Sequence, residues 1–138
     1  MTEAEFRVMH SQLIEYFQYI EFHMKAICAD LLADEQKSWF EHLNDYESDS
    51  LGTMLREIRS LQVEKKVNLL TQEDLDTLEE MRKTRNYWVH QCFSGIPHIS
   101  FRKGELRYAV HGERLRSDLQ RAIEWDEKIT EIGRAITK

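Results

Sequence analysis

The feature that most constrains the fold is an apolar stripe at the start of the chain. Its residues recur at steps of three and four, the spacing that places side chains on one face of an α-helix. Thr2 followed by Glu5 forms a capping-box pattern that would start this helix. The pattern predicts one long amphipathic helix whose apolar face consists of Phe6, Met9, Leu13, Phe17, Ile20, Met24, Ile27 and Leu31, broadened by Tyr16, Tyr19 and Phe22.

His10 and His23 lie near the edges of this stripe. Histidine is of intermediate polarity and is common at the boundary between core and solvent. We therefore interpret both as boundary residues.

Two further amphipathic helices, and a less regular segment before them, are predicted after the first helix. Residues 33–44 are less regular and predict a short helix or a packed connection. A third helix, capped by Ser48 or Ser50, carries apolar residues at helical spacing from Leu51 to Leu61. A fourth begins at Thr71, and its inner face comprises Leu75, Leu78, Met81, Arg85, Trp88, Val89 and Cys92.

After Gly95 and Pro97, which would end the fourth helix, the period of the apolar residues changes. Apolar and polar residues alternate around a potential turn at residues 102–104, which predicts a short β-hairpin. Helical spacing returns from Gly112 to the end of the chain. We therefore expect an all-α domain spanning residues 1–138, a four-to-five-helix bundle with a short β-hairpin between the last two helices.

Composition narrows the function classes. The net charge of −6 argues against a broad nucleic-acid-binding surface, so any RNA site must be local. Cys28 and Cys92 provide no disulfide framework and fit a reducing compartment. No leader pattern and no apolar run long enough to span a bilayer are found. We expect a cytoplasmic protein that does not enter a membrane.

The stretch Arg85-Asn86-Tyr87-Trp88-Val89-His90 carries the chemistry. Arginine offers a fixed cation with a planar donor fork, and histidine exchanges a proton near neutral pH. On a straight helix Arg85 and His90 project about 140° apart, whereas His90 stacks on Asn86. One ligand could therefore reach both only through the length of the arginine, a distorted helix end or a second copy of the chain.

Other chemistries lack a pattern in this sequence. Glu-x-x-His pairs, Cys-x-x-Cys pairs and His-Glu-x-x-His are missing, which argues against a metal site. Phosphate-binding glycine loops are also missing, and no cofactor is indicated. Cys92 lies two residues from His90, and residues two apart on a helix do not face each other. We interpret Cys92 as a core thiol.

Basic residues near the motif and on the predicted hairpin are candidate RNA-binding residues because cations neutralise phosphates. The competing interpretation is a solvated surface, since acidic residues are interspersed. The candidates are Arg82, Lys83, Arg102, Lys103 and Arg107.

The motif resembles that of the HEPN superfamily (higher eukaryotes and prokaryotes nucleotide-binding), whose members are helical bundles of this size. The family pattern is an arginine, four to six residues beginning with a polar one, and a histidine late in a helix. The resemblance implies metal-independent RNA cleavage by a homodimer, with one composite site where two motif helices meet. It implies that Arg85 binds the scissile phosphate, His90 moves a proton and Asn86 orients one of the reacting groups.

Small HEPN toxins are paired with a nucleotidyltransferase-like antitoxin, and a common form continues His-x-Tyr. This chain reads His90-Gln91-Cys92, so it lacks the tyrosine on which that antitoxin acts. Two hypotheses remain: a HEPN ribonuclease that acts as a toxin or defence effector, or a non-catalytic helical module that binds a protein or nucleotide. In the second, Arg85 would be paired with a structural carboxylate.

Overall fold

The computed structural model describes the backbone of residues 1–91 and 105–136, and the side chains of residues 1–90 and 111–136. The described chain forms five α-helices and one π-helical turn. They are α1 (Glu3–Leu32), α2 (Trp39–Asp45), α3 (Leu51–Lys65), α4 (Gln72–Asn86), the π-turn η1 (Tyr87–Gln91) and α6 (Glu105–Ile136). The predicted all-α class is confirmed.

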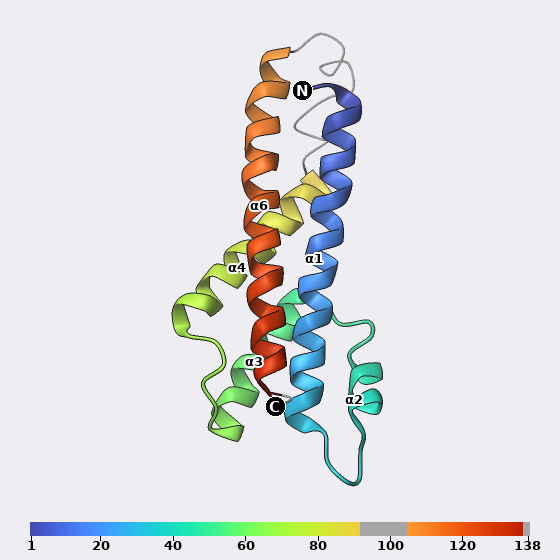
Figure 1. Ribbon diagram of the computed structural model, residues 1–138, viewed down its shortest axis with the longest axis vertical. Coiled ribbons are helices and arrows are strands. Elements are labelled where there is room, and N and C mark those ends of the chain that lie inside the picture. The colour runs from blue at the N-terminus through green and yellow to red at the C-terminus, as the bar shows by residue number, and fades with distance from the viewer. Residues whose placement is uncertain (92–104, 137–138) are drawn as a thin grey trace.

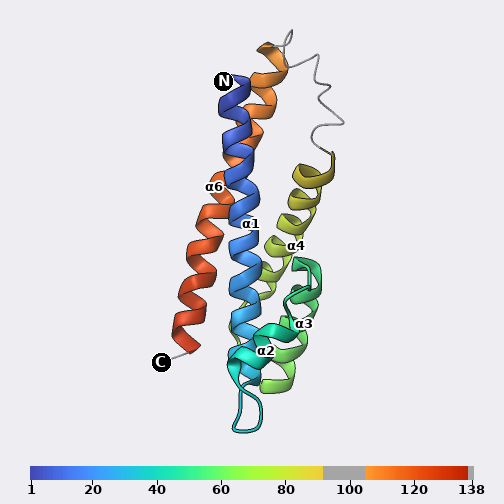
Figure 2. The same cartoon turned by 90° about the vertical axis from the view of Figure 1, so that its right-hand side faces the viewer.

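The two longest helices, α1 and α6, lie side by side and run in the same direction (Figures 1 and 2). Contacts between corresponding levels of the two helices accompany this parallel arrangement, such as His23 with Asp126 in the C-terminal half of each helix. The helices α3 and α4 cover one side of this pair, and α2 packs near the C-terminal end of α1 (Figure 2). The motif at the end of α4 is thereby brought against the N-terminal half of α1.

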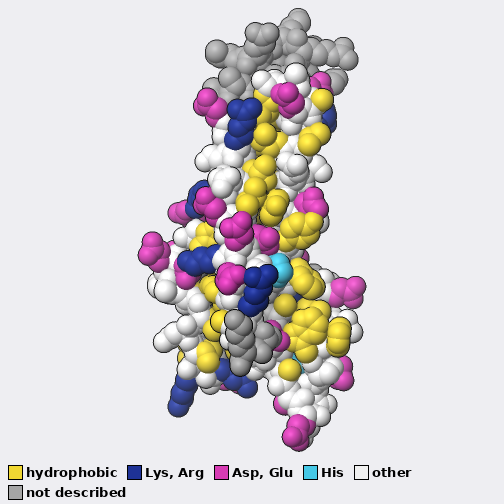
Figure 3. Space-filling view, in the orientation of Figure 1, with side chains coloured by type: hydrophobic (Ala, Val, Ile, Leu, Met, Phe, Trp, Pro, Cys, Tyr) yellow, Lys and Arg dark blue, Asp and Glu magenta, His cyan; other side chains and the backbone are white. Residues whose placement is uncertain are grey.

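The predicted stripe of α1 is the centre of the core. Six of its residues are at most 1% exposed: Phe6, Leu13, Phe17, Ile20, Met24 and Ile27. Burying each such side chain contributes roughly 1.5–3 kcal/mol. Leu115, Ala122 and Ile129 of α6 complete this core, and hydrophobic side chains follow the seam between α1 and α6 on the face shown in Figure 3.

The predicted broadening of the stripe is wrong at two positions. Tyr19 is 42% exposed and Phe22 is 49% exposed, whereas Tyr16 is half-buried against the core. The neighbouring helices pack on the narrower face centred on Phe17 and Ile20, which leaves the flank of α1 open. Spacing within one helix does not reveal how far its partners extend around it.

Helix starts follow the predicted caps. Both capping boxes are formed, by Thr2 with Glu5 and by Thr71 with Asp74. Of the two candidates for the start of α3, the cap is Ser50, whose hydroxyl accepts from the backbone N–H of Thr53. These bonds satisfy N–H groups that have no partner inside the helix.

The predicted β-hairpin is not supported. Leu106, Tyr108 and Val110, which were expected to form its second strand, lie in the first turns of α6. Alternation over three apolar residues is a weak signal, and extending an existing helix costs far less free energy than starting a new element. The expected first strand and the turn at residues 102–104 lie outside the described residues.

Across residues 1–91 and 105–136, no helix is long and apolar enough to cross a membrane.

Candidate functional site

The motif spans a change in helix type. Arg85 and Asn86 are the last two residues of α4, and Tyr87 to His90 lie in the π-turn η1. In a π-turn the hydrogen bonds join residues five apart, and such turns are rare and often found at functional sites. The structure therefore contains the distorted helix end that the sequence left as one way to reconcile Arg85 with His90.

Trp88 anchors this turn in the core. Its side chain is 0% exposed, and its ring packs against Phe6 with centroids 6.2 Å apart. Its indole Nε1–H donates to Oδ2 of Asp118 on α6 at 2.7 Å. The side chain of Trp88 thus fixes the turn to both long helices.

His10 makes a second tie to the turn. Its Nε2 lies 2.7 Å from the backbone carbonyl oxygen of Trp88. A carbonyl oxygen can only accept, so Nε2 carries the proton that is donated. The interpretation of His10 as a boundary residue agrees with its half-buried position but missed this contact, which joins residues that lie far apart in the sequence.

Arg114 covers the outer side of the turn. Its guanidinium carbon lies 3.9 Å from the centre of the Tyr87 ring, a cation–π arrangement. Its Nε lies 3.8 Å from Oδ2 of Asp118, the oxygen that accepts the hydrogen bond from Trp88. Arg114 therefore supports the motif rather than adding to a diffuse basic surface.

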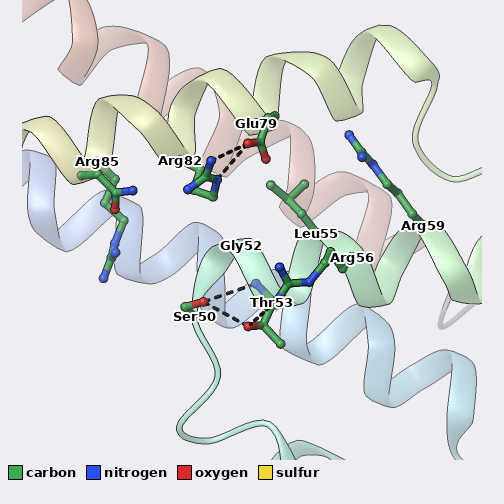
Figure 4. A pocket seen from close by; sticks show the side chains of 10 residues that line it. Ser50, Gly52, Thr53, Leu55, Arg56, Arg59, Glu79, Arg82 and Arg85 are labelled. Atoms are coloured by element: carbon green, nitrogen blue, oxygen red, sulfur yellow. Dashed lines mark hydrogen bonds and ion pairs between the residues drawn. The ribbon is translucent and has the colours of Figure 1, made fainter.

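A pocket of about 580 Å³ lies between the start of α3 and the second half of α4 (Figure 4). This volume is in the range of small-ligand sites. Arg85 and Asn86 reach it from the motif. The full lining is Ser50, Gly52, Thr53, Leu55, Arg56, Arg59, Glu79, Arg82, Arg85 and Asn86.

The lining of this pocket is strongly positive. Four guanidinium groups less one carboxylate leave a charge of +3, in a chain whose net charge is −6. The carboxylate belongs to Glu79, which accepts from Nε and Nη2 of Arg82 at 3.0 and 2.6 Å. These hydrogen bonds outweigh the effect of burial and lower the pKa of Glu79, so Glu79 is ionised at neutral pH.

Arg85 is half-buried and forms no ion pair or hydrogen bond with the part of the chain that the structure describes. A partly buried cation without a partner is unfavourable unless an anion binds it. The carboxylate partner required by the non-catalytic hypothesis is therefore not found for Arg85 among the described side chains of residues 1–90 and 111–136.

His90 does not join Arg85 and Asn86 in the pocket. It is exposed and is not part of the lining. Val89, predicted to face inward, is 40% exposed, because the π-turn shifts the positions after Trp88 away from the inner face of α4. One copy of the chain thus presents Arg85 with Asn86 in one place and His90 in another.

Of the five predicted RNA-binding residues, the structure describes the side chains of two. Arg82 lines the pocket, and Lys83 is exposed on α4. Arg102, Lys103 and the side chain of Arg107 lie outside the described residues.

Among the described side chains, no group of three or more His, Cys, Asp or Glu residues is arranged to hold a metal ion.

Sequence reasoning missed the contribution of α3. Arg56 and Arg59 are three residues apart and line the pocket opposite α4. Their spacing places them on one polar face of a helix, which could have been read from the sequence. That this face lies opposite Arg82 and Arg85 depends on how α3 and α4 pack.

Comparisons with protein-family models, with curated protein sequences and with solved structures found no match to this chain. The features of this chain that bear on its function are the motif, the π-turn and the arginine-lined pocket.

Proposed function

We propose that this protein is a HEPN-type, metal-independent endoribonuclease, acting in the cytoplasm as a toxin or defence effector. The observation that carries the proposal is Arg85, which has no ion pair among the described side chains and lies beside Asn86 in a positively charged pocket at the start of a π-turn. A half-buried guanidinium without a carboxylate is suited to a phosphate, to which it can donate two parallel hydrogen bonds.

The proposed reaction is cleavage by the neighbouring ribose hydroxyl. His90 accepts the proton of the 2′-hydroxyl, and the oxygen attacks the adjacent phosphorus. The bond from phosphorus to the 5′-oxygen of the next nucleotide breaks, leaving a cyclic phosphate, and the leaving oxygen is protonated by an acid or water. Arg85 stabilises the charge that develops on the phosphoryl oxygens, and Asn86 orients the reacting groups.

A second copy of the chain would complete the site. His90 lies outside the pocket that holds Arg85, so two motif ends meeting around a two-fold axis would bring His90 of one copy to Arg85 of the other. The proposed assembly is a homodimer with RNA bound at the interface. A nucleotidyltransferase-like antitoxin is a proposed further partner, whose mode of control would differ because residue 92 is cysteine instead of tyrosine.

Expression toxicity and cleavage of purified total RNA test the proposal. We expect His90→Ala to lower the cleavage rate about 10²–10⁴-fold, as for loss of a general acid or base. Loss of Arg85 should lower it by about 10²–10³-fold. His42→Ala on α2 and Arg116→Ala on α6 are matched controls outside the pocket and should behave as wild type. If wild type and His90→Ala are equally harmless and neither cuts RNA, the nuclease proposal fails.

Mixing the two inactive variants tests the composite site. In a mixed dimer of Arg85→Ala and His90→Ala, one intact Arg85 and one intact His90 come from different copies. Recovery of cleavage on mixing would support a site shared between copies. A protein that remains monomeric by sedimentation yet cleaves RNA would contradict it.

The competing proposal is a non-catalytic helical module, and the position of His90 outside the pocket favours it. It predicts ligand binding without cleavage in every mixture of variants. The cleavage assays above separate the two.

A further inference from the structure

We infer that the α3 side of the pocket is a binding site for the phosphates that flank the scissile bond of a single-stranded RNA. Arg56 and Arg59 are its principal residues. The inference rests on the proposed function for the identity of the ligand, and on the described contacts for the site itself.

Neither Arg56 nor Arg59 is neutralised by a carboxylate among the side chains that the structure describes. Arg59 forms no ion pair or hydrogen bond with the described part of the chain, and the contact of Arg56 is with the hydroxyl of Thr53 at 3.5 Å. Both side chains are exposed where they line the pocket. Their positive charge is therefore available to an anion that enters between α3 and α4.

The arrangement of the arginines favours a strand over a single phosphate. In Figure 4, Arg85 and Arg59 lie at opposite ends of the pocket, with Arg82 and Arg56 between them. A lone phosphate would need donors converging on one point. A row of cations instead matches a polyanion whose charges follow one another along a backbone.

The row begins at the proposed catalytic arginine. A strand with its scissile phosphate at Arg85 would place the following phosphates near Arg82 and then near the two arginines of α3. Glu79 lies in this path and holds Arg82 through two hydrogen bonds. Removing that carboxylate should therefore strengthen RNA binding, an effect that a misfolded variant would not produce.

The experiment measures binding of a short fluorescein-labelled single-stranded RNA by fluorescence anisotropy. All proteins carry His90→Ala, so that cleavage does not interfere. We expect the double variant Arg56→Gln/Arg59→Gln to bind roughly tenfold more weakly. It should also lower the slope of log affinity against log salt by about 1.4, since each contact with a single strand contributes about 0.7.

The matched control is Arg116→Gln/Arg134→Gln on α6, which removes the same charge from exposed positions outside the pocket. It should change affinity less than twofold. Glu79→Gln should increase affinity several-fold. Far-UV circular dichroism and thermal unfolding verify that each variant is folded.

Competition with orthophosphate and with a ribonucleoside triphosphate distinguishes a strand from a single phosphorylated ligand. We expect unlabelled RNA to compete at far lower concentration than either. If either small anion competes as well as RNA, or if the α3 double variant retains affinity and salt slope, the inference is overturned.

Failure of the proposed function is recognised separately. RNA binding that depends on Arg56 and Arg59 in a chain that never cleaves would support the site and refute the nuclease. Cleavage with a KM unchanged by the double substitution, in a protein without His90→Ala, would refute the site and leave the nuclease standing.

Discussion

The hydrogen bond between Trp88 and Asp118 provides a direct test of how the motif is held. Replacing Trp88 by phenylalanine removes the indole N–H that donates to Asp118 at 2.7 Å. A hydrogen bond to a charged acceptor contributes about 1.5–3 kcal/mol. We take the lower end of this range, about 1.5 kcal/mol, because the side chain of Asp118 is still 15% exposed and can hydrogen-bond to water when the indole is removed.

The smaller ring also leaves space in the core. Trp88 is fully buried, and losing part of its ring should cost about 1–2 kcal/mol in addition. The total is about 3 kcal/mol. Unfolding entropy is about 2.1 cal/mol/K per residue, so for a chain of 138 residues this corresponds to a fall in Tm of roughly 10 °C.

A double-mutant cycle isolates the hydrogen bond from the cavity. Trp88→Phe, Asp118→Ala and the double variant are unfolded with urea and followed by far-UV circular dichroism. The expected coupling energy is about 1.5 kcal/mol. Asp118→Ala and the double variant both lose the contact between Asp118 and Arg114, so this loss does not contribute to the coupling energy.

Trp125→Phe, the same substitution on α6, is the matched control. No hydrogen bond joins Trp125 to Asp118 among the described side chains, so the pair should couple by less than about 0.5 kcal/mol. A coupling equally small for Trp88 and Asp118 would refute the assignment of this bond as the anchor of the π-turn.

Three further predictions concern other parts of the fold. Burial raises the pKa of Asp74, but hydrogen bonds from Lys128 and the backbone of Thr71 outweigh it and lower the pKa overall. The lowered pKa of Asp74 stabilises the folded state above the unfolded pKa, which is near 4, and this stabilisation is lost as pH falls through the folded pKa. Asp74→Asn should therefore lower the free energy of unfolding by about 1 kcal/mol at pH 7, a value discounted because Lys128 is half exposed. Urea unfolding should show that this difference vanishes in strong acid. Burial raises the pKa of Cys28 to about 12. In a chain whose other cysteine is replaced by serine, Ellman's reagent at pH 8 should therefore not react with Cys28 until urea unfolds the protein. Rapid reaction of the native chain would contradict this. Gly52→Ala would place a Cβ 2.9 Å from Cδ of Arg82 and displace the arginine, so RNA affinity should fall. The free energy of unfolding should change by less than about 1 kcal/mol, because alanine favours the helix. An unchanged affinity would show that Arg82 does not contact the strand.

The sequence alone determined the features that depend on neighbours a few residues away. The starts of α1 and α4 were predicted correctly because a capping box involves residues three apart, such as Thr71 and Asp74. The inner face of α1 was predicted because its apolar period is regular over many turns. By contrast, the alternation of Leu106, Tyr108 and Val110 was too short to establish a strand period.

The tertiary structure decided how the motif is presented. The π-turn at Trp88 is tied to His10 of α1 and Asp118 of α6, and no local pattern links three residues so far apart in the chain. The pocket likewise exists because α3 places Arg56 and Arg59 opposite α4. Burial and electrostatic contact depend on which surfaces meet in space. A single sequence indicates which residues share one face of a helix, but it does not indicate which other helix packs against that face.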